Sequence, residues 1–107
     1  MKGFIYVMSN PAFRDSWFKI GYSERDPTEY RSKELENTSI PTPFKVEYVA
    51  LVENPKRIEK NVHASLSKYR VNMQREFFNC PLERCVEAIR LVADEALKYD
   101  ELYGEFS

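Results

Sequence analysis

A tyrosine and a glycine in two short apolar segments are the residues of this chain with the clearest chemical potential. The segments, residues 3–7 and 18–22, are rich in β-branched and aromatic residues and are separated by turn-forming residues, which predicts two antiparallel strands. Pairing of these strands would put Tyr6 opposite Gly21, so that a phenol would lie beside a strand position without a side chain. Composition alone favours the simpler interpretation that both strands only fill a core.

Two predicted helices would bring ionisable side chains toward the same region. Asp26 and Pro27 predict a helix that runs to about residue 36, because aspartate is a preferred N-cap and proline is tolerated in the first turn. Arg31 would lie in the second turn of this helix. From there its guanidinium could reach whatever binds at the strand end that carries Gly21.

The second helix is expected to begin at Asn54 and Pro55 by the same capping logic. Its apolar stripe recurs at helical spacing and comprises Ile58, Val62, Leu66 and Tyr69. This spacing leaves Glu59 and His63 one turn apart, beside the face that packs on the rest of the protein.

The remaining elements predict a small α/β (α+β) fold. Residues 44–51 alternate and then become wholly apolar, as a third strand would, and residues 75–79 could add a short edge strand. A last helix is expected from about residue 81 to residue 99. The order of elements indicates a mainly antiparallel sheet of three to four strands, flanked by helices.

Length and composition indicate one domain, residues 1–107, with its core in about residues 3–79. No apolar run is long enough to span a bilayer and no signal-peptide pattern is present, so we expect a cytoplasmic protein without a membrane partner. Cys80 and Cys85 lack metal-ligand spacing and are expected to be free thiols. With His63 as the single histidine, a Cys/His metal site is not expected.

Charge is distributed unevenly along the chain although its net value is only −1. Residues 83–107 carry seven acids and three bases, whereas residues 1–82 carry thirteen bases and ten acids. The excess positive charge therefore belongs to the part that holds the candidate site. This distribution permits nucleic-acid binding, but a solvated basic face would look the same.

Taken together, these motifs resemble the GIY-YIG nuclease superfamily. The resemblance rests on residues 3–6, residues 19–21, Arg31 and Glu59, in that order along the chain. It is strongest toward the compact phage-T5-ORF-like branch of the superfamily. That branch is indicated by residues 19–23, 25–27 and 40–44, and by the series from Glu59 through His63, Leu66, Tyr69 and Arg70 to residues 75–78.

The resemblance implies roles for individual residues. Tyr6 would be the tyrosine of the first motif, Gly21 the glycine of the second, Arg31 the catalytic arginine and Glu59 the carboxylate that holds a divalent metal ion. The chain departs from the family pattern in two places. Lys19 stands where the second motif has its tyrosine, and Phe4 occupies the slot before Ile5 and Tyr6.

These residue types suit hydrolysis of a phosphodiester bond. A single Mg²⁺ or Mn²⁺ ion can act as Lewis acid and template, and it needs an oxygen ligand such as Glu59. The planar fork of Arg31 can bond two phosphate oxygens. Tyr6 would act as general base, and its ordinary pKa of about 10 requires a nearby cation such as Lys19. Tyr22 could share this role.

Further side chains could support the site. Gly21 would let substrate or the Arg31 helix approach the sheet closely, and Glu76 and Asn79 could close the site, with a plain edge-strand role as the alternative. His63 could orient water or contact DNA, or it could pack against Tyr69. Backbone phosphates could be positioned by basic residues, namely Lys56, Arg57, Lys60, Lys68, Arg70 and Arg75.

Each central role has a plainer alternative. Glu59 could be an exposed carboxylate paired with Lys56 or Lys60, and Arg31 could form a salt bridge with Glu29 or Glu34. Three hypotheses follow: a metal-dependent endonuclease that cuts DNA, an inactive nucleic-acid-binding or regulatory module, and an interaction protein whose acidic last helix docks a partner. For the endonuclease, target choice would come from a targeting protein or from a homodimer, or would be absent, because no second domain for target recognition is expected.

Overall fold

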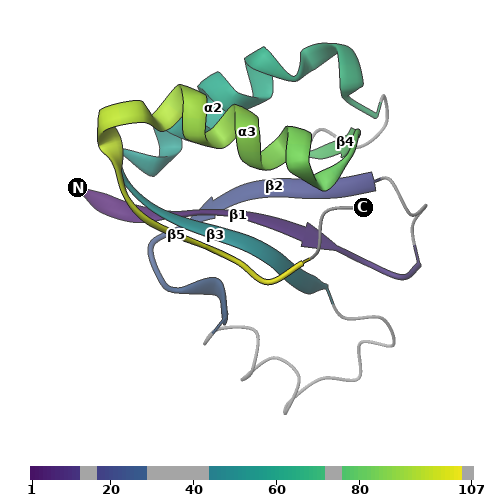
Figure 1. Cartoon of the computed structure of the whole chain (residues 1–107), viewed down its shortest axis with the longest axis horizontal. Coiled ribbons are helices and arrows are strands. Elements are labelled where there is room, and N and C mark those ends of the chain that lie inside the picture. The colour runs from purple at the N-terminus through teal and green to yellow at the C-terminus, as the bar shows by residue number, and fades with distance from the viewer. Residues whose placement is uncertain (13–16, 29–43, 72–75, 105–107) are drawn as a thin grey trace.

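The computed structural model describes residues 1–12, 17–28, 44–71 and 76–104. Two helices, α2 (Pro55–Ser65) and α3 (Leu82–Ala93), lie over one face of an antiparallel sheet (Figure 1). The strands are β1 (Lys2–Ser9), β2 (Trp17–Ser23), β3 (Lys45–Glu53), β4 (Phe77–Asn79) and β5 (Leu97–Leu102). Short 3₁₀ turns at Ser67–Tyr69 and Asp94–Ala96 follow the two helices. The predicted α+β class with an antiparallel sheet is confirmed.

The strand order across the sheet is β4-β2-β1-β3-β5, so β1 lies at the centre and β4 and β5 form the edges. β1 and β2 pair with Tyr6 directly opposite Gly21, as the sequence predicts. Side chains alternate along β1, and Ile5 and Val7 are fully buried while Tyr6 is half-buried. Tyr6 and Gly21 therefore share the face of the sheet that does not carry the main core.

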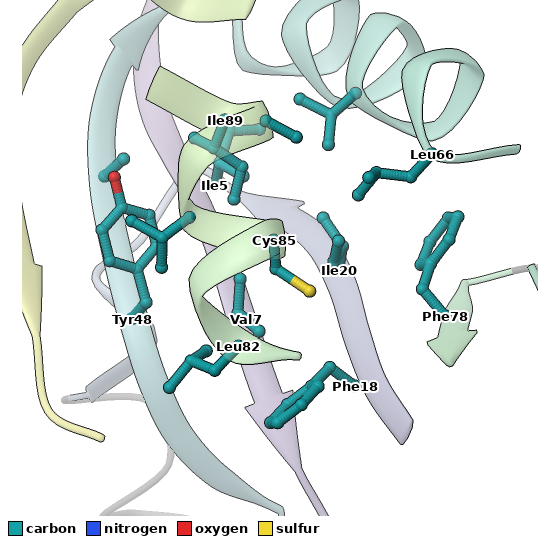
Figure 2. Packing of buried hydrophobic residues seen from close by; sticks show 14 of the residues in the cluster. Ile5, Val7, Phe18, Ile20, Tyr48, Leu66, Phe78, Leu82, Cys85 and Ile89 are labelled. Atoms are coloured by element: carbon teal, nitrogen blue, oxygen red, sulfur yellow. The ribbon is translucent and has the colours of Figure 1, made fainter. Parts of the chain in front are cut away.

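The main core lies between the sheet and the two helices (Figure 2). Ile5 and Val7 of β1 and Ile20 of β2 meet side chains from both helices there, among them Leu82, Cys85 and Ile89 of α3. On α2, the predicted stripe is confirmed, because Ile58 and Val62 are buried and Leu66 is buried just after the helix ends. This packing fixes α2 against β2 and thereby sets where the polar side chains of α2 lie.

The starts of the two site-bearing helices differ: the predicted side-chain cap is present at Asp26 and absent at Asn54. The backbone N–H of Thr28 donates to Asp26 Oδ1 at 2.9 Å, and Pro27 and Thr28 are helical. The rest of this expected helix, including Arg31, lies outside the described residues. Asn54 precedes α2 but makes no side-chain cap, and instead adopts a φ of 52°, which asparagine tolerates better than most residues.

The expected helix from residue 81 to residue 99 is wrong beyond Ala93. α3 ends there because Asp94 has a positive φ of 46°, and residues 97–102 form β5 on the free edge of β3. β5 extends the sheet beyond the three to four strands expected. The predicted edge strand near residues 75–79 is confirmed as β4.

Both cysteines are free, as predicted. They are also buried, and their Sγ atoms lie 3.5 Å apart. Within the described ranges, no helix is long and apolar enough to cross a bilayer.

Candidate nuclease-like site at the edge of β2

The side chain of Tyr6 lies across β2 at the position of Gly21. A Cβ atom added to Gly21 would overlap the phenol oxygen and ring carbons of Tyr6. Any side chain at position 21 would therefore displace the Tyr6 ring. The absence of a side chain at Gly21 is thus what lets the phenol lie close against the strand, toward its outer edge.

The outer edge of β2 is only partly paired by another strand. β4 is three residues long and pairs with residues 17–19, and the backbone N–H of Ile20 donates to the carbonyl of Glu76 at 2.9 Å. Beyond this point, no strand among the described residues lies beside the edge of β2. Its remaining backbone groups need other partners, because unpaired groups are costly once shielded from water.

Two side chains of α2 supply those partners. His63 Nε2 donates to the Ile20 carbonyl at 2.8 Å, which means that Nε2 carries the proton, because a carbonyl only accepts. The Glu59 carboxylate accepts a hydrogen bond from the backbone N–H of Tyr22. Glu59 and His63, one helical turn apart, thus continue the hydrogen bonding of the edge where β4 stops.

This arrangement brings Tyr6 and Glu59 to the same short stretch of β2. The Tyr6 hydroxyl lies over Gly21, and the Glu59 carboxylate bonds the N–H of the next residue, Tyr22. Adjacent residues of one strand are only 3.8 Å apart at Cα. The phenol and the carboxylate, which are 53 positions apart in the sequence, therefore converge on a single peptide unit.

Lys19 and Glu76 add charge to this point. Lys19 lies on the same face of β2 as Gly21, two residues earlier, and its Nζ is 3.7 Å from Glu76 Oε2. The same ammonium group lies 5.2 Å from the centre of the Phe44 ring. A cation, two carboxylates and a phenol therefore surround the outer edge of β2.

The electrostatic environment of Glu59 is unusual for a helix carboxylate. Burial and the neighbouring Glu76 carboxylate raise the pKa of Glu59 to about 6, although Lys19 and the Tyr22 N–H act in the opposite direction. Among the residues that the structure describes, Glu59 forms no ion pair with Lys56 or Lys60. The alternative of an exposed, lysine-paired carboxylate does not describe this side chain.

His63 is half-buried and contacts an aromatic ring. Its ring packs on the Phe78 ring with centroids 4.9 Å apart. Burial and the Arg70 guanidinium lower the pKa of His63, while its bond to the Ile20 carbonyl and the Glu76 carboxylate oppose the shift. The imidazole is therefore neutral at pH 7, with Nδ1 left as an acceptor.

A surface hollow of about 480 Å³ opens beside Glu59 and His63. Glu59 and His63 form part of its wall, and Lys56, Lys60 and Arg70 supply positive charge around them. Ala64 and Ser67 also line it and were not singled out from the sequence. Their spacing from Lys60 and His63, four residues in each case, is the signal that could have identified them.

Other predicted residues lie apart from the hollow or outside the described ranges. Asn79 pairs with Trp17, two positions beyond Lys19 and away from Gly21. The ammonium group of Lys68 lies 5.1 Å from the centre of the Tyr69 ring. Arg31 and Arg75 fall among the residues that are not described.

The donor set is consistent with a hard divalent cation without being a closed metal site. No group of three or more histidine, cysteine, aspartate or glutamate side chains among the described residues could hold an ion. Mg²⁺, however, usually keeps several waters and takes one or two carboxylates. Burial and the Glu76 charge disfavour the charged form of Glu59, and a bound cation would stabilise that form. The residues present therefore fit the ion.

Comparison with known proteins places the chain in a family. Residues 3–93 match the T5orf172 domain, a phage-associated domain related to nuclease-like folds. No curated protein and no solved structure matches the chain. The matched range contains β1 from its second residue, β2, β3, β4, α2 and α3, and therefore the edge of β2 where Tyr6 and Glu59 meet. The chain belongs to the T5orf172 domain family.

Proposed function

We propose that this protein is a metal-dependent endonuclease of the GIY-YIG type that hydrolyses phosphodiester bonds in DNA. Membership in the T5orf172 family is compatible with a nuclease-like or DNA-binding role. The observation that carries the proposal is the convergence of the Tyr6 phenol and the Glu59 carboxylate on the Gly21–Tyr22 peptide. A hollow with basic walls, to whose lining Glu59 belongs, offers room for a phosphate group.

In this proposal Tyr6 removes a proton from the attacking water. Its ordinary pKa of about 10 makes the phenol a weak base at neutral pH unless a cation lies nearby. Lys19 shares a face of the sheet with Tyr6 and is within reach across the strand pair. The role of Lys19 is then to favour the phenolate, and it replaces the tyrosine that the second family motif usually carries.

Glu59 would hold one Mg²⁺ or Mn²⁺ ion, which supplies Lewis-acid stabilisation of the phosphate and of the leaving oxygen when bound. The raised pKa of Glu59 fits this role, because a carboxylate that is poorly compensated by the protein gains most from a cation. Arg31, on the expected helix after Asp26, would bond the phosphate oxygens. The basic walls of the hollow would hold the flanking backbone.

The test is relaxation of supercoiled plasmid at low salt with Mg²⁺ or Mn²⁺, comparing the wild type with Glu59→Gln and Tyr6→Phe. We expect both variants to lose nicking by at least about 100-fold, the scale of a general base or of a metal ligand. Glu83→Gln, which changes an exposed carboxylate on α3, is the matched control and should nick as the wild type does. Full nicking by Glu59→Gln would contradict the proposal.

A second function is favoured by one observation. Glu59 and His63 already serve a structural purpose, because they satisfy backbone groups at the edge of β2. The same residues would be kept by a nucleic-acid-binding module without catalysis. In that case the wild type would retain DNA without nicking it under any divalent cation, and Glu59→Gln would retain DNA equally well.

A further inference from the structure

Tyr22 presents a large ring to solvent at the junction of two surface hollows. It is 39% exposed, whereas Ile20, two residues earlier on the same face of β2, is fully buried. The first hollow is the one that contains Glu59 and His63. The second, of about 610 Å³, lies around the start of α2, and both hollows are lined by Tyr22, Lys56 and Lys60. The two hollows therefore adjoin along one aromatic and two basic side chains.

We propose that the second hollow binds the nucleotide next to the scissile phosphate, with its unpaired base stacked on Tyr22. The inference rests on the proposed function for the position of the scissile phosphate in the first hollow. It names the substrate class as single-stranded nucleic acid or a single-stranded segment within a duplex. Stacking on an aromatic ring requires a free base face, which a base inside a duplex does not offer.

The walls of the second hollow are those that a nucleotide would need. Lys56, Lys60 and Arg57 supply positive charge for phosphates. Asn54 and Glu24 line the same hollow and offer hydrogen-bonding groups for a base edge. Because the carboxylate of Glu24 would repel a bare phosphate, the mixture of groups fits a base with its phosphates better than it fits an inorganic anion.

The shared residues explain how one strand would run through both hollows. Lys56 and Lys60 are one turn apart on α2 and line both hollows. Phosphates on either side of the stacked nucleotide would meet these two ammonium groups. The end of β2 and the start of α2 lie at the same end of the molecule (Figure 1).

The experiment measures fluorescence anisotropy of a labelled oligothymidylate, of a strand of equal length whose bases are all replaced by abasic sites, and of a duplex. The buffer contains EDTA, so that cleavage does not interfere. The proteins are the wild type, Tyr22→Ala, Tyr22→Phe and, as a matched control, Tyr99→Ala. Tyr99 is 50% exposed on β5, at the opposite edge of the sheet.

We expect the wild type to bind the abasic strand about tenfold more weakly than oligothymidylate, the scale of one base–aromatic stack. Tyr22→Ala should lose this preference, and Tyr22→Phe and Tyr99→Ala should keep it. The salt dependence should separate stacking from charge. Tyr22→Ala should keep the wild-type slope, whereas Lys60→Ala should lower it by about 0.7, the loss of one phosphate contact on a single strand.

Equal affinity of the wild type for the abasic strand and for oligothymidylate would overturn the inference, and this comparison needs no variant to fold. Absence of binding at low salt, or tighter binding to the duplex, would also overturn it. The plasmid assay separates the two proposals. If the wild type nicks plasmid but binds both strands equally, only the proposal of a stacked nucleotide is wrong. If the wild type prefers oligothymidylate, loses this preference in Tyr22→Ala and nicks no plasmid, only the endonuclease proposal is wrong.

Discussion

The Tyr6 phenol can lie against β2 only because position 21 has no side chain. The Cβ of any other residue there would overlap the hydroxyl and ring of Tyr6. The same two residues are strand partners, so the pairing of β1 and β2 keeps the two positions side by side and only the Tyr6 ring can give way. The added methyl group of alanine at position 21 would therefore be enough to keep the Tyr6 phenol from its place in the site.

Replacement of Gly21 by alanine should therefore disable the site and strain the fold. We expect plasmid nicking to fall at least about tenfold and the free energy of unfolding to fall by about 1–3 kcal/mol, the usual cost of overpacking. Urea unfolding and nicking rates measure the two effects. In a Tyr6→Ala background the overlap is absent, so Gly21→Ala should change the free energy of unfolding little there. An equal loss of stability in both backgrounds would show that the Tyr6 ring is not what position 21 must avoid.

Glu59 is expected to destabilise the fold near neutral pH when no metal ion is present. Its pKa in the folded state is about 6, above the ordinary value of 4.5. The folded protein therefore holds the proton more tightly, and stability falls as the pH rises from the ordinary value through 6. Above that range the cost is constant, about 1 kcal/mol after allowance for solvent screening.

Glu59→Gln removes this cost while its amide oxygen can still accept the Tyr22 N–H. Urea unfolding in EDTA should show the variant more stable than the wild type by about 1 kcal/mol at pH 7 and equal to it at pH 4. Glu83→Gln should change neither value. Parallel stability curves for the wild type and Glu59→Gln across this range would mean that Glu59 is not held in an unfavourable environment.

Among the elements, β5 is held by a partly buried polar contact between the sheet and α3. The hydroxyl of Tyr48, a fully buried residue of β3, donates to Asp100 Oδ2 at 2.7 Å, and Arg90 Nε of α3 donates to the same oxygen at 2.7 Å. Burial acts to raise the pKa of Asp100, but the bonds from Tyr48 and Arg90 outweigh it and lower the pKa below its ordinary value. Asp100 therefore connects β5 to both β3 and α3.

This contact should make the fold sensitive to acid. A carboxylate with a lowered pKa contributes stability above its ordinary value of 3.8, and that contribution is lost as the pH falls through the folded-state value. Asp100→Asn should flatten the acid limb of the stability curve and lower the free energy of unfolding at pH 7 by about 1–3 kcal/mol. Urea unfolding against pH checks both, with Asp94→Asn, just after α3, as the control. An unchanged acid limb would contradict the role of Asp100.

The sequence predicted the central elements well because their signals are local. The alternation of β1 and β2 and the helical stripe of α2 each follow from a few neighbouring residues, and the pairing of Tyr6 with Gly21 followed from these. β5 could not be predicted in the same way. Val92, Ala93, Ala96 and Leu97 continue the helical spacing of α3, and only the free edge of β3 makes a strand the better choice for residues 97–102.

The edge position of Glu59 and His63 was also beyond local patterns. The sequence placed both side chains beside the buried face of α2, which is where they lie. Their bonds to β2 depend on β4 being only three residues long and on where it stops. The unpaired stretch of the β2 edge depends on how three separate segments meet, so the sequence of any one segment does not predict it.

For the whole molecule, the distribution of charge is more informative than its sum. The net charge is −1, yet Lys56, Arg57, Lys60 and Arg70 line the two hollows beside Glu59. Acidic residues are concentrated instead in the last quarter of the chain. A polyanion would therefore be drawn to one region of the molecule rather than to its whole surface.

Removal of Lys56 and Lys60 together should weaken binding to duplex DNA in a salt-dependent way. With each lysine contacting one phosphate, the slope of log affinity against log salt should become less steep by about 1.8, or about 0.9 for each contact. Anisotropy titrations over a series of salt concentrations measure it. Lys45→Ala together with Lys98→Ala, on β3 and β5, is the matched control, and a slope that changes equally in both pairs would show that binding is spread over the surface.

The central claim is that Tyr6 and Glu59 form one site around Gly21. Anomalous diffraction from a crystal soaked in Mn²⁺ tests it most directly, because the anomalous signal of manganese marks the position of the ion. We predict an anomalous peak on the Glu59 carboxylate, on the side that faces the Tyr6 hydroxyl, and no such peak in Glu59→Gln crystals. An ion bound elsewhere in the wild type, with Glu59 left without one, would contradict the account.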